Sequence, residues 1–217
     1  MLSLAEENYL KAIYHLSEDG TKDVLTNALA DSMQTKAASA TDMIKKLSNK
    51  KFISYKKYYG VNVTAKGKSQ ALQVIRKHRL WETFLVQKLG FTWDEVHEVA
   101  EQLEHIKSPR LIEKLDEFLG FPTADPHGDP IPDGDGKIKT KPHIPLDHLN
   151  EGYRGVIVAV KDSDSDLLKY LDKIGATPGK KIQLISKEAY DDSMEVTLGD
   201  QKIFISKEVS KNILVTE

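Results

Sequence analysis

The sequence has no cysteine among its 217 residues. Disulfide bonds, thiolate metal ligands and a cysteine nucleophile are therefore excluded, and the composition fits a cytoplasmic protein. No apolar run approaches the roughly 18 residues that a membrane-spanning helix needs. The first residues, MLSLAEENYL, have acids early and lack the basic-then-apolar order of a secretory signal, so we expect no signal peptide.

Several catalytic motifs are also missing. The sequence has no HExxH pattern, no serine in a nucleophile motif and no glycine-rich phosphate loop. We therefore expect a protein that is not an enzyme. A metallohydrolase that uses Glu104 and His105 remains the enzymatic alternative, although it would leave a basic amino-terminal region unexplained.

Charge is segregated along the chain, although the formal net charge is only −2. Residues 36–68 contain nine lysines and one acid, whereas residues 94–119 contain eight acids and three basic residues. A basic block beside an acidic block indicates a polyanion partner for the first and a cation for the second.

The basic block follows a pattern that is typical of DNA-binding modules. A capping box, Ser3 to Glu6, predicts a helix over 4–16, and two further helices are expected at 26–33 and 36–49. Ala40, Ile44 and Leu47 form the inward stripe of the last helix. The runs 52–55 and 61–64, around Gly60, predict a hairpin with lysines and tyrosines at its tip. Together these elements predict a winged helix-turn-helix.

A long helix is expected over 65–89 and ends at Gly90, and Ser108-Pro109 opens another helix that ends at Gly120. Between them lies DEVHEVAEQLEHI, residues 94–106. As one helix it would carry His97, Glu101, Glu104 and His105 along a single stripe, with a separate packing face made by Val96, Val99, Leu103 and Ile106. Imidazole and carboxylate suit divalent transition metals. A solvated acidic face with two incidental histidines is the alternative interpretation.

The remainder of the chain predicts a linker and a small β domain. Residues 121–152 hold six of the eight prolines. Five short strands are then expected at 155–160, 181–186, 194–199, 202–206 and 212–216, with a helix at about 166–174 and a hairpin turn at 198–201. The fold class is mainly α with a small β domain. The domains are a winged helix-turn-helix at 1–64, a helical metal-binding and dimerisation domain at 65–122, a Pro/Gly-rich linker at 123–152 and an SH3-like domain at 153–217.

Taken in order, these motifs resemble the diphtheria-toxin-repressor family of metal-dependent transcriptional repressors, which has iron-dependent and manganese-dependent branches. The resemblance rests on EENYLKAIYHL, the wing ending in VTAKG, RKHRLWE at 76–82, EVHEVAEQLEHI followed by SPRLIEKL, and PHGDPIP at 126–132. The segment GATPGKKI at 175–182 is similar to the SH3-like domain of longer members and to ferrous-iron-transport protein A.

The resemblance implies two metal sites. The primary site corresponds to Asn8, Glu101, Glu104 and His105. Asn8 stands where the iron branch has methionine and the manganese branch aspartate, and Lys11 stands where the manganese branch has a further acid, which argues against a two-metal cluster of that kind. The ancillary site corresponds to His78, Glu82 and His97, with Asp125 and His127 from the following loop. Asp162, Asp164 or Asp166 could add a ligand, or could simply cap the next helix.

The expected cofactor is Mn(II) or Fe(II), with manganese favoured because Glu101 replaces the cysteine of the iron branch; Zn(II) and Co(II) are not excluded. The expected partners are pseudo-palindromic operator DNA and a second copy of the chain, in a protein that controls metal-homeostasis genes. A winged-helix regulator without a metal switch is the alternative. The DNA-contacting residues are expected to be Thr35, Lys36, Ala37, Ser39, Thr41, Lys45, Lys56 and Lys57.

Overall fold

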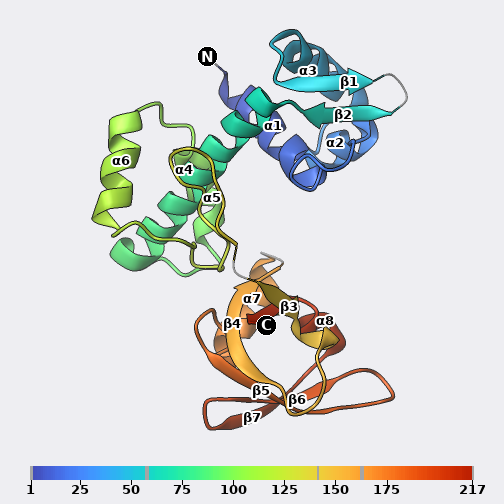
Figure 1. Ribbon diagram of the computed structural model, residues 1–217, viewed down its shortest axis with the longest axis vertical. Coiled ribbons are helices and arrows are strands. Elements are labelled where there is room, and N and C mark those ends of the chain that lie inside the picture. Colours follow the sequence, from blue (N-terminus) through green and yellow to red (C-terminus); the bar gives the residue numbers. More distant parts are fainter. Residues whose placement is uncertain (1, 57–58, 141, 162–163, 217) are drawn as a thin grey trace. The chain divides into compact units, whose positions relative to one another are not determined.

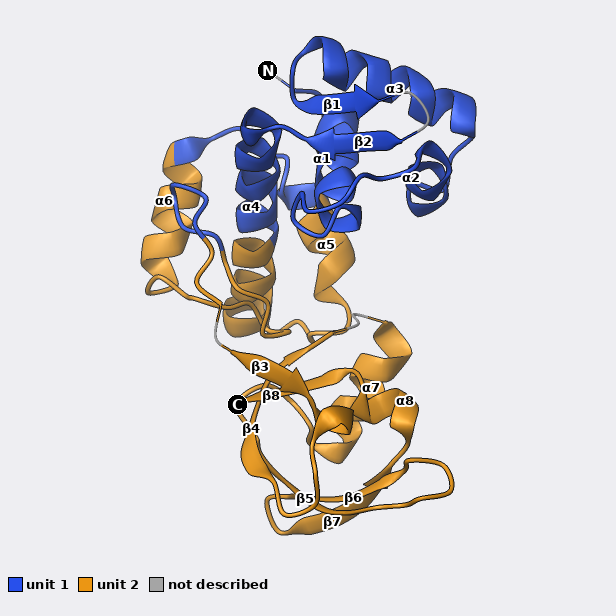
Figure 2. Cartoon of the chain, turned by 45° about the vertical axis from the view of Figure 1, so that its right-hand side comes forward, with its two compact units in different colours: residues 1–78, 102–109, 132–137 blue, residues 79–101, 110–131, 138–217 orange. Residues whose placement is uncertain are grey.

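The computed structural model describes residues 2–56, 59–140, 142–161 and 164–216 (Figure 1). The chain forms two compact units that interleave along the sequence (Figure 2). The first contains residues 1–78, 102–109 and 132–137, and the second contains residues 79–101, 110–131 and 138–217. Among the described helices, none is both long and apolar enough to cross a membrane.

The first unit is a winged helix-turn-helix. It contains α1 (Leu4–Leu16), α2 (Thr26–Ser32), α3 (Ala37–Asn49), β1 (Ile53–Lys56) and β2 (Gly60–Val63). The predicted capping box closes the start of α1: Ser3 Oγ accepts from the Glu6 amide, and Glu6 accepts from the Ser3 amide. Ala40, Ile44 and Leu47 are buried on α3, so the predicted inward stripe is confirmed.

The strands of the wing pair antiparallel, with Ile53 opposite Val63. The first half of α4 (Ala65–Leu89) packs against this module. A Cβ at Gly67 would lie 1.9 Å from the carbonyl oxygen of Phe52, so only glycine permits this close approach of the helix to the chain.

The second unit joins helices to the β domain. It contains the second half of α4, most of α5 (Val96–Leu103), α6 (Pro109–Phe118) and a six-stranded antiparallel sheet. The strand order is β3-β8-β4-β5-β6-β7. The strands are β3 (His143–Pro145), β4 (Arg154–Val160), β5 (Lys181–Lys187), β6 (Met194–Leu198), β7 (Gln201–Ile205) and β8 (Ile213–Thr216). The smaller helices are η1 (Leu146–His148), α7 (Ser165–Ile174) and α8 (Lys207–Ser210).

The core of the β domain is continuous and apolar. Leu146, Leu168, Leu184 and Met194 are among its fully buried residues, and Trp93, which precedes α5, packs into the same cluster. The five predicted strands and the helix predicted at about 166–174, which is α7, are confirmed. The linker prediction was incomplete, because β3 pairs with β8 through His143 and Thr216 inside the segment expected to be a linker.

The helix expected over 94–106 is shorter than predicted. It runs from Val96 to Leu103, and Glu104 and His105 lie in the turn after its end. The prediction that one helix carries all four ligand side chains is therefore wrong for Glu104 and His105. The supposed packing face is also incomplete, because Ile106 is only partly buried whereas Glu104 is fully buried. The turn breaks the helix five residues before Pro109, which starts α6.

Candidate metal centres and DNA-binding surface

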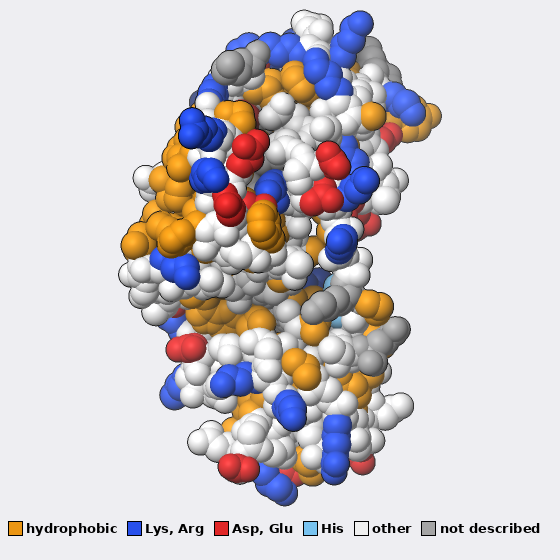
Figure 3. Space-filling model, turned by 60° about the vertical axis from the view of Figure 1, so that its left-hand side comes forward, with side chains coloured by type: hydrophobic (Ala, Val, Ile, Leu, Met, Phe, Trp, Pro, Cys, Tyr) orange, Lys and Arg blue, Asp and Glu red, His pale blue; other side chains and the backbone are white. Residues whose placement is uncertain are grey.

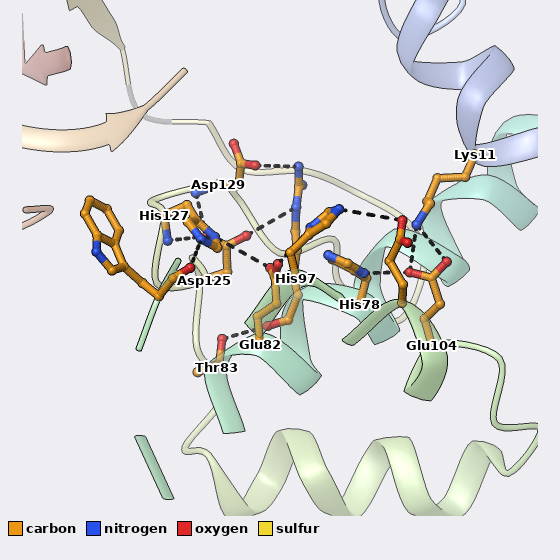
Figure 4. A network of polar contacts seen from close by, with 12 residues as sticks. Lys11, His78, Glu82, Thr83, His97, Glu104, Asp125, His127 and Asp129 are labelled. Carbon is orange, nitrogen blue, oxygen red and sulfur yellow. Dashed lines mark hydrogen bonds and ion pairs between the residues drawn. The ribbon is translucent and has the colours of Figure 1, made fainter. Parts of the chain in front are cut away.

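Glu104 is the centre of a polar cluster in the first unit (Figure 4). Its carboxylate is fully buried and accepts from Lys11 Nζ at 2.7 and 2.9 Å. His78 Nδ1 lies 2.6 Å from the second oxygen. Burial alone would raise the pKa of Glu104, but the hydrogen bond with His78 and the charge of Lys11 outweigh it and hold that pKa below its ordinary value. Glu104 is therefore an anion inside the fold.

His105 presents a second potential ligand to the same region. Its Nδ1 lies 2.7 Å from Glu7 Oε2 on α1. A histidine that donates from Nδ1 to a carboxylate carries its lone pair on Nε2, the usual arrangement of a metal-bound imidazole. His105 Nε2 is buried and lies 3.6 Å from Glu104 Oε1. Glu7 was missed in the sequence, because nothing in a sequence shows which acid orients a histidine from another element.

Two unsatisfied buried atoms bear on whether these residues could hold a metal ion. Within the described residues, Asn8 Oδ1 and His105 Nε2 are buried without a hydrogen-bond partner. Unsatisfied buried acceptors are rare in folded proteins and need an explanation. An amide oxygen, an imidazole nitrogen and a carboxylate oxygen form a hard, thiolate-free donor set that suits a divalent cation. Asn8, Glu104 and His105 would hold it.

Two further predicted ligands have contacts of their own. Glu101 belongs to the second unit, where its side chain is about half exposed and lies 3.6 Å from His97 Nε2. His78, which the resemblance placed in the ancillary set, contacts Glu104 of the primary set. His78 and Glu82 remain one turn apart on α4.

A second cluster is formed within the second unit by Glu82, Asp125 and His127. One ligand atom of each lies within 4.8 Å of the others, and all three side chains are buried. His127 Nδ1 is 3.8 Å from both Glu82 Oε2 and Asp125 Oδ1. Its Nε2 lies 2.7 Å from the carbonyl oxygen of Trp93, and the two rings stack. The ring is thereby held with Nδ1 toward the two carboxylates.

Neighbouring groups adjust the charge of this cluster. His97 Nδ1 lies 3.4 Å from Glu82 Oε1, and Arg79 contacts Asp125 at 3.6 Å. Burial, with the charges of Asp129 and Glu82, raises the pKa of Asp125 to about 7. Burial alone would lower the pKa of His127, but its interactions with Glu82 and Asp125 raise it to about 9. The two carboxylates therefore favour a positive charge at this position, and the protonated ring of His127 provides it.

The candidate DNA-binding residues surround α3 and the wing. Lys36, Ala37 and Ser39 are exposed at the start of α3, Lys45 is exposed in its second half, and Lys56 is exposed on β1. Thr35 and Thr41 are partly buried, and the Thr41 hydroxyl donates to the Ala37 carbonyl oxygen at 2.8 Å. Lys57 lies outside the described residues.

One candidate ligand of the β domain has a structural role. Asp164 caps α7, because its side chain accepts from the amides of Asp166 and Leu167. Asp162 lies outside the described residues.

Comparisons with known proteins identify three domains along the chain. Residues 1–61 match the family described as "Iron dependent repressor, N-terminal DNA binding domain", residues 64–133 match "Iron dependent repressor, metal binding and dimerisation domain", and residues 144–217 match "FeoA domain". The iron-dependent repressor IdeR of Mycobacterium tuberculosis (strain ATCC 25618 / H37Rv) is 30% identical over 188 residues, which cover 81% of each chain.

Solved structures show the same fold along nearly the whole chain. A structure described as "Manganese-dependent transcriptional repressor complex with manganese" is 33% identical, has a TM-score of 0.86, and matches over 98% of this chain and 99% of that one. A structure described as "Crystal Structure of ScaR with bound Zn2+" is also 33% identical, with a TM-score of 0.77 over 98% and 99% of the two chains.

The fold and the matched domains define a metal-dependent transcriptional repressor. The chain belongs to the iron-dependent repressor family, with a carboxy-terminal FeoA domain. The family consists of transcriptional regulators, so the predictions of family and of a non-enzymatic function are confirmed. Activation by a divalent metal is typical of the family, and domains for DNA binding and dimerisation are present.

Proposed function

We propose that this repressor binds pseudo-palindromic operator DNA as a homodimer in the cytoplasm when Mn(II) or Fe(II) fills its metal centres, and that it controls genes of metal uptake. The pair of unsatisfied buried atoms, Asn8 Oδ1 and His105 Nε2, carries the proposal. They lie in the same unit as the helix-turn-helix, so metal binding and DNA binding share one folded body.

Manganese is the favoured metal, with Fe(II) as the alternative. The chain has no cysteine, and the candidate ligands offer carboxylate, amide and imidazole atoms. This donor set suits Mn(II) or Fe(II), while raw affinity follows the Irving–Williams order and gives manganese no advantage over other metals. The solved structure with a TM-score of 0.86 is that of a manganese-dependent repressor with manganese, whereas the similar mycobacterial proteins are named iron-dependent repressors.

Helix α1 links the metal centre to the DNA-binding module. It supplies Glu7 and Asn8, while the turn after α5 supplies Glu104 and His105. A bound divalent cation supplies positive charge and directed bonds between these two segments. Glu7 contacts the His105 ring, and the Asn8 oxygen is buried without a partner. A metal ion bound by both Asn8 and His105 would add a further link between α1 and this turn. A coupling of about 1–3 kcal/mol is enough to change DNA affinity several-fold.

The start of α3 is the proposed reading surface. The first residues of a recognition helix meet base edges in helix-turn-helix complexes, and small side chains such as Ala37 and Ser39 allow a close approach. Lys36, Lys45, Lys56 and Lys57 are proposed as phosphate contacts. These position the protein without reading sequence.

Dimerisation is proposed to use the helical part of the second unit. Leu111 and Phe118 of α6 are exposed hydrophobic side chains, as are Leu89 at the end of α4 and Phe121 just after α6. Figure 3 shows a group of hydrophobic side chains along the left-hand edge of the upper part of the face in view. An exposed apolar patch of this kind marks an interaction surface, and the matched dimerisation domain covers residues 64–133.

The proposal is tested by DNA selection and binding. A pool of random duplexes is enriched on the protein with Mn(II) present, and binding of the selected duplex is followed by fluorescence anisotropy. We expect tight binding with Mn(II) or anaerobic Fe(II) and a loss of at least about tenfold when a chelator removes the metal. Equal binding with and without metal would instead support a winged-helix regulator that has no metal switch.

A further inference from the structure

Lys11 places a positive charge inside the primary centre. Its ammonium contacts both oxygens of Glu104, at 2.7 and 2.9 Å, and its side chain is only 15% exposed. Figure 4 shows Lys11 reaching from α1 to this carboxylate. The pair joins α1 to the turn that carries Glu104 and His105, the same two segments that the proposed metal ion would join.

The acceptor positions of Glu104 are almost filled. A carboxylate has about four lone-pair directions. Among the described residues, Lys11 takes one on each oxygen and His78 takes the second on Oε2. The remaining direction belongs to Oε1, the atom that lies 3.6 Å from His105 Nε2. Glu104 can therefore serve one metal ion on the His105 side while Lys11 stays in place.

We propose that Lys11 is a built-in cation that occupies one side of Glu104, limits this centre to a single metal ion, and weakens the binding of that ion. The inference rests on the proposed metal centre and adds a positioning residue to it. Two physical effects act in the same direction. The ammonium already neutralises the carboxylate, and its charge repels a divalent cation bound to the same group.

The benefit of this arrangement lies in the metal-free protein. Without Lys11, the buried anion of Glu104 would have His78 as its remaining partner. Lys11 lets the site remain folded and anionic before metal arrives. The free metal concentration at which the centre fills then depends on Lys11 as well as on the ligands, because a site with lower metal affinity fills only at a higher free metal concentration.

The test is Mn(II) binding to the full chain by equilibrium dialysis, with Mn(II) as the only added metal. Lys11→Met removes the charge and keeps the length of the side chain, and we expect its Mn(II) affinity at this centre to rise by roughly tenfold or more. Lys11→Arg keeps the charge and should bind like the wild type. An unchanged or weakened affinity in Lys11→Met would overturn the inference.

Lys77→Met is the matched control. Lys77 is partly buried in the same unit, and its charge reaches Glu7 and Glu104, yet neither carboxylate has it as a hydrogen-bond partner in the described part of the chain. We expect a much smaller change in affinity than in Lys11→Met. Equal changes in the two variants would show that only the general field matters, and the role of the Lys11 contact would be refuted.

The number of Mn(II) ions that Lys11→Glu binds per chain provides an independent test. This substitution places a second carboxylate beside Glu104 and His78, so we expect one more Mn(II) per chain than in the wild type. An equal number of bound ions contradicts the inference even if Lys11→Met fails to fold.

His105→Ala separates the proposal of the metal centre from the proposal about Lys11. If it binds as many ions as the wild type, the metal centre itself is wrong. If it loses an ion while Lys11→Met and Lys11→Glu match the wild type, only the role of Lys11 fails.

Discussion

The unsatisfied atoms Asn8 Oδ1 and His105 Nε2 are the residue-scale reason to place a metal ion in the first unit. The pattern of histidines and carboxylates over residues 94–106 could suggest His105, whereas only the family resemblance could suggest Asn8. The sequence could not reveal that Lys11 contacts Glu104 or that Glu7 orients His105. These contacts depend on where α1 meets the turn after α5, and that meeting is a property of tertiary packing.

Replacing ligands in the first unit should separate metal binding from stability. His105→Ala should abolish metal-activated DNA binding with little change in unfolding. Glu104→Ala should also abolish it, but we expect an additional loss of about 1–3 kcal/mol in the free energy of unfolding, because Lys11 and His78 are left without their buried partner. Urea unfolding of both variants, without metal, measures the difference. Equal stabilities would contradict the role of the Glu104 cluster in the fold.

Metal binding in the second unit should depend on pH. The pKa of His127 is raised to about 9, so the ring is protonated at neutral pH, and a metal ion must displace that proton. Affinity should therefore rise with pH up to about 9, by roughly tenfold for each unit when one proton is released. Mn(II) titrations at several pH values, in a His105→Ala background, isolate this site. A flat profile, or the same slope in His127→Gln, would argue against His127 as a ligand.

At the scale of elements, most of the secondary structure could be read from the sequence. The capping box at Ser3, the stripe on α3 and Gly90 after α4 are local signals, and each agrees with the structure. The end of α5 was not readable, because 3.6-residue periodicity continues past Leu103 while the helix does not. Strand β3 was also missed, since its pairing with β8 joins residues more than sixty positions apart.

Gly67 should be intolerant of any side chain, because a Cβ there overlaps the Phe52 carbonyl. We expect Gly67→Ala to lower the free energy of unfolding by at least about 2 kcal/mol. Ser69→Ala, at an exposed position of the same helix, is the control and should have little effect. Thermal unfolding measures both. A Gly67→Ala variant as stable as the wild type would mean that α4 does not lie this close to the wing.

The DNA-binding elements should divide between phosphate contact and base reading. Lys56→Ala should weaken binding to all sequences alike and reduce the salt slope by about 1, as the loss of a phosphate contact does. Ser39→Ala should instead change the preference among sequences; it is a better choice than Thr41, whose hydroxyl bonds its own helix. Binding of selected and scrambled duplexes at several salt concentrations distinguishes the two. Identical effects would refute the division.

For the whole molecule, the exposed apolar side chains on and beside α6 predict self-association. Phe118 is 62% exposed, although Phe84 and Lys88 contact its ring. We expect light scattering to give twice the chain mass of 24.4 kDa for the wild type. Phe118→Glu should shift the protein toward a monomer, whereas Phe204→Glu, on an exposed strand residue of the FeoA domain, should not. A wild type of 24.4 kDa with and without Mn(II) would exclude the proposed dimer.

The most direct measurement is Mn(II)-dependent binding of selected DNA by the wild type and by His105→Ala, followed by fluorescence anisotropy. The wild type should bind at least about tenfold more tightly with Mn(II) than with chelator. His105→Ala should keep its weak metal-free binding and gain nothing from Mn(II). A His105→Ala variant that responds to Mn(II) as the wild type does would show that the proposed metal centre at Asn8, Glu104 and His105 is not the switch.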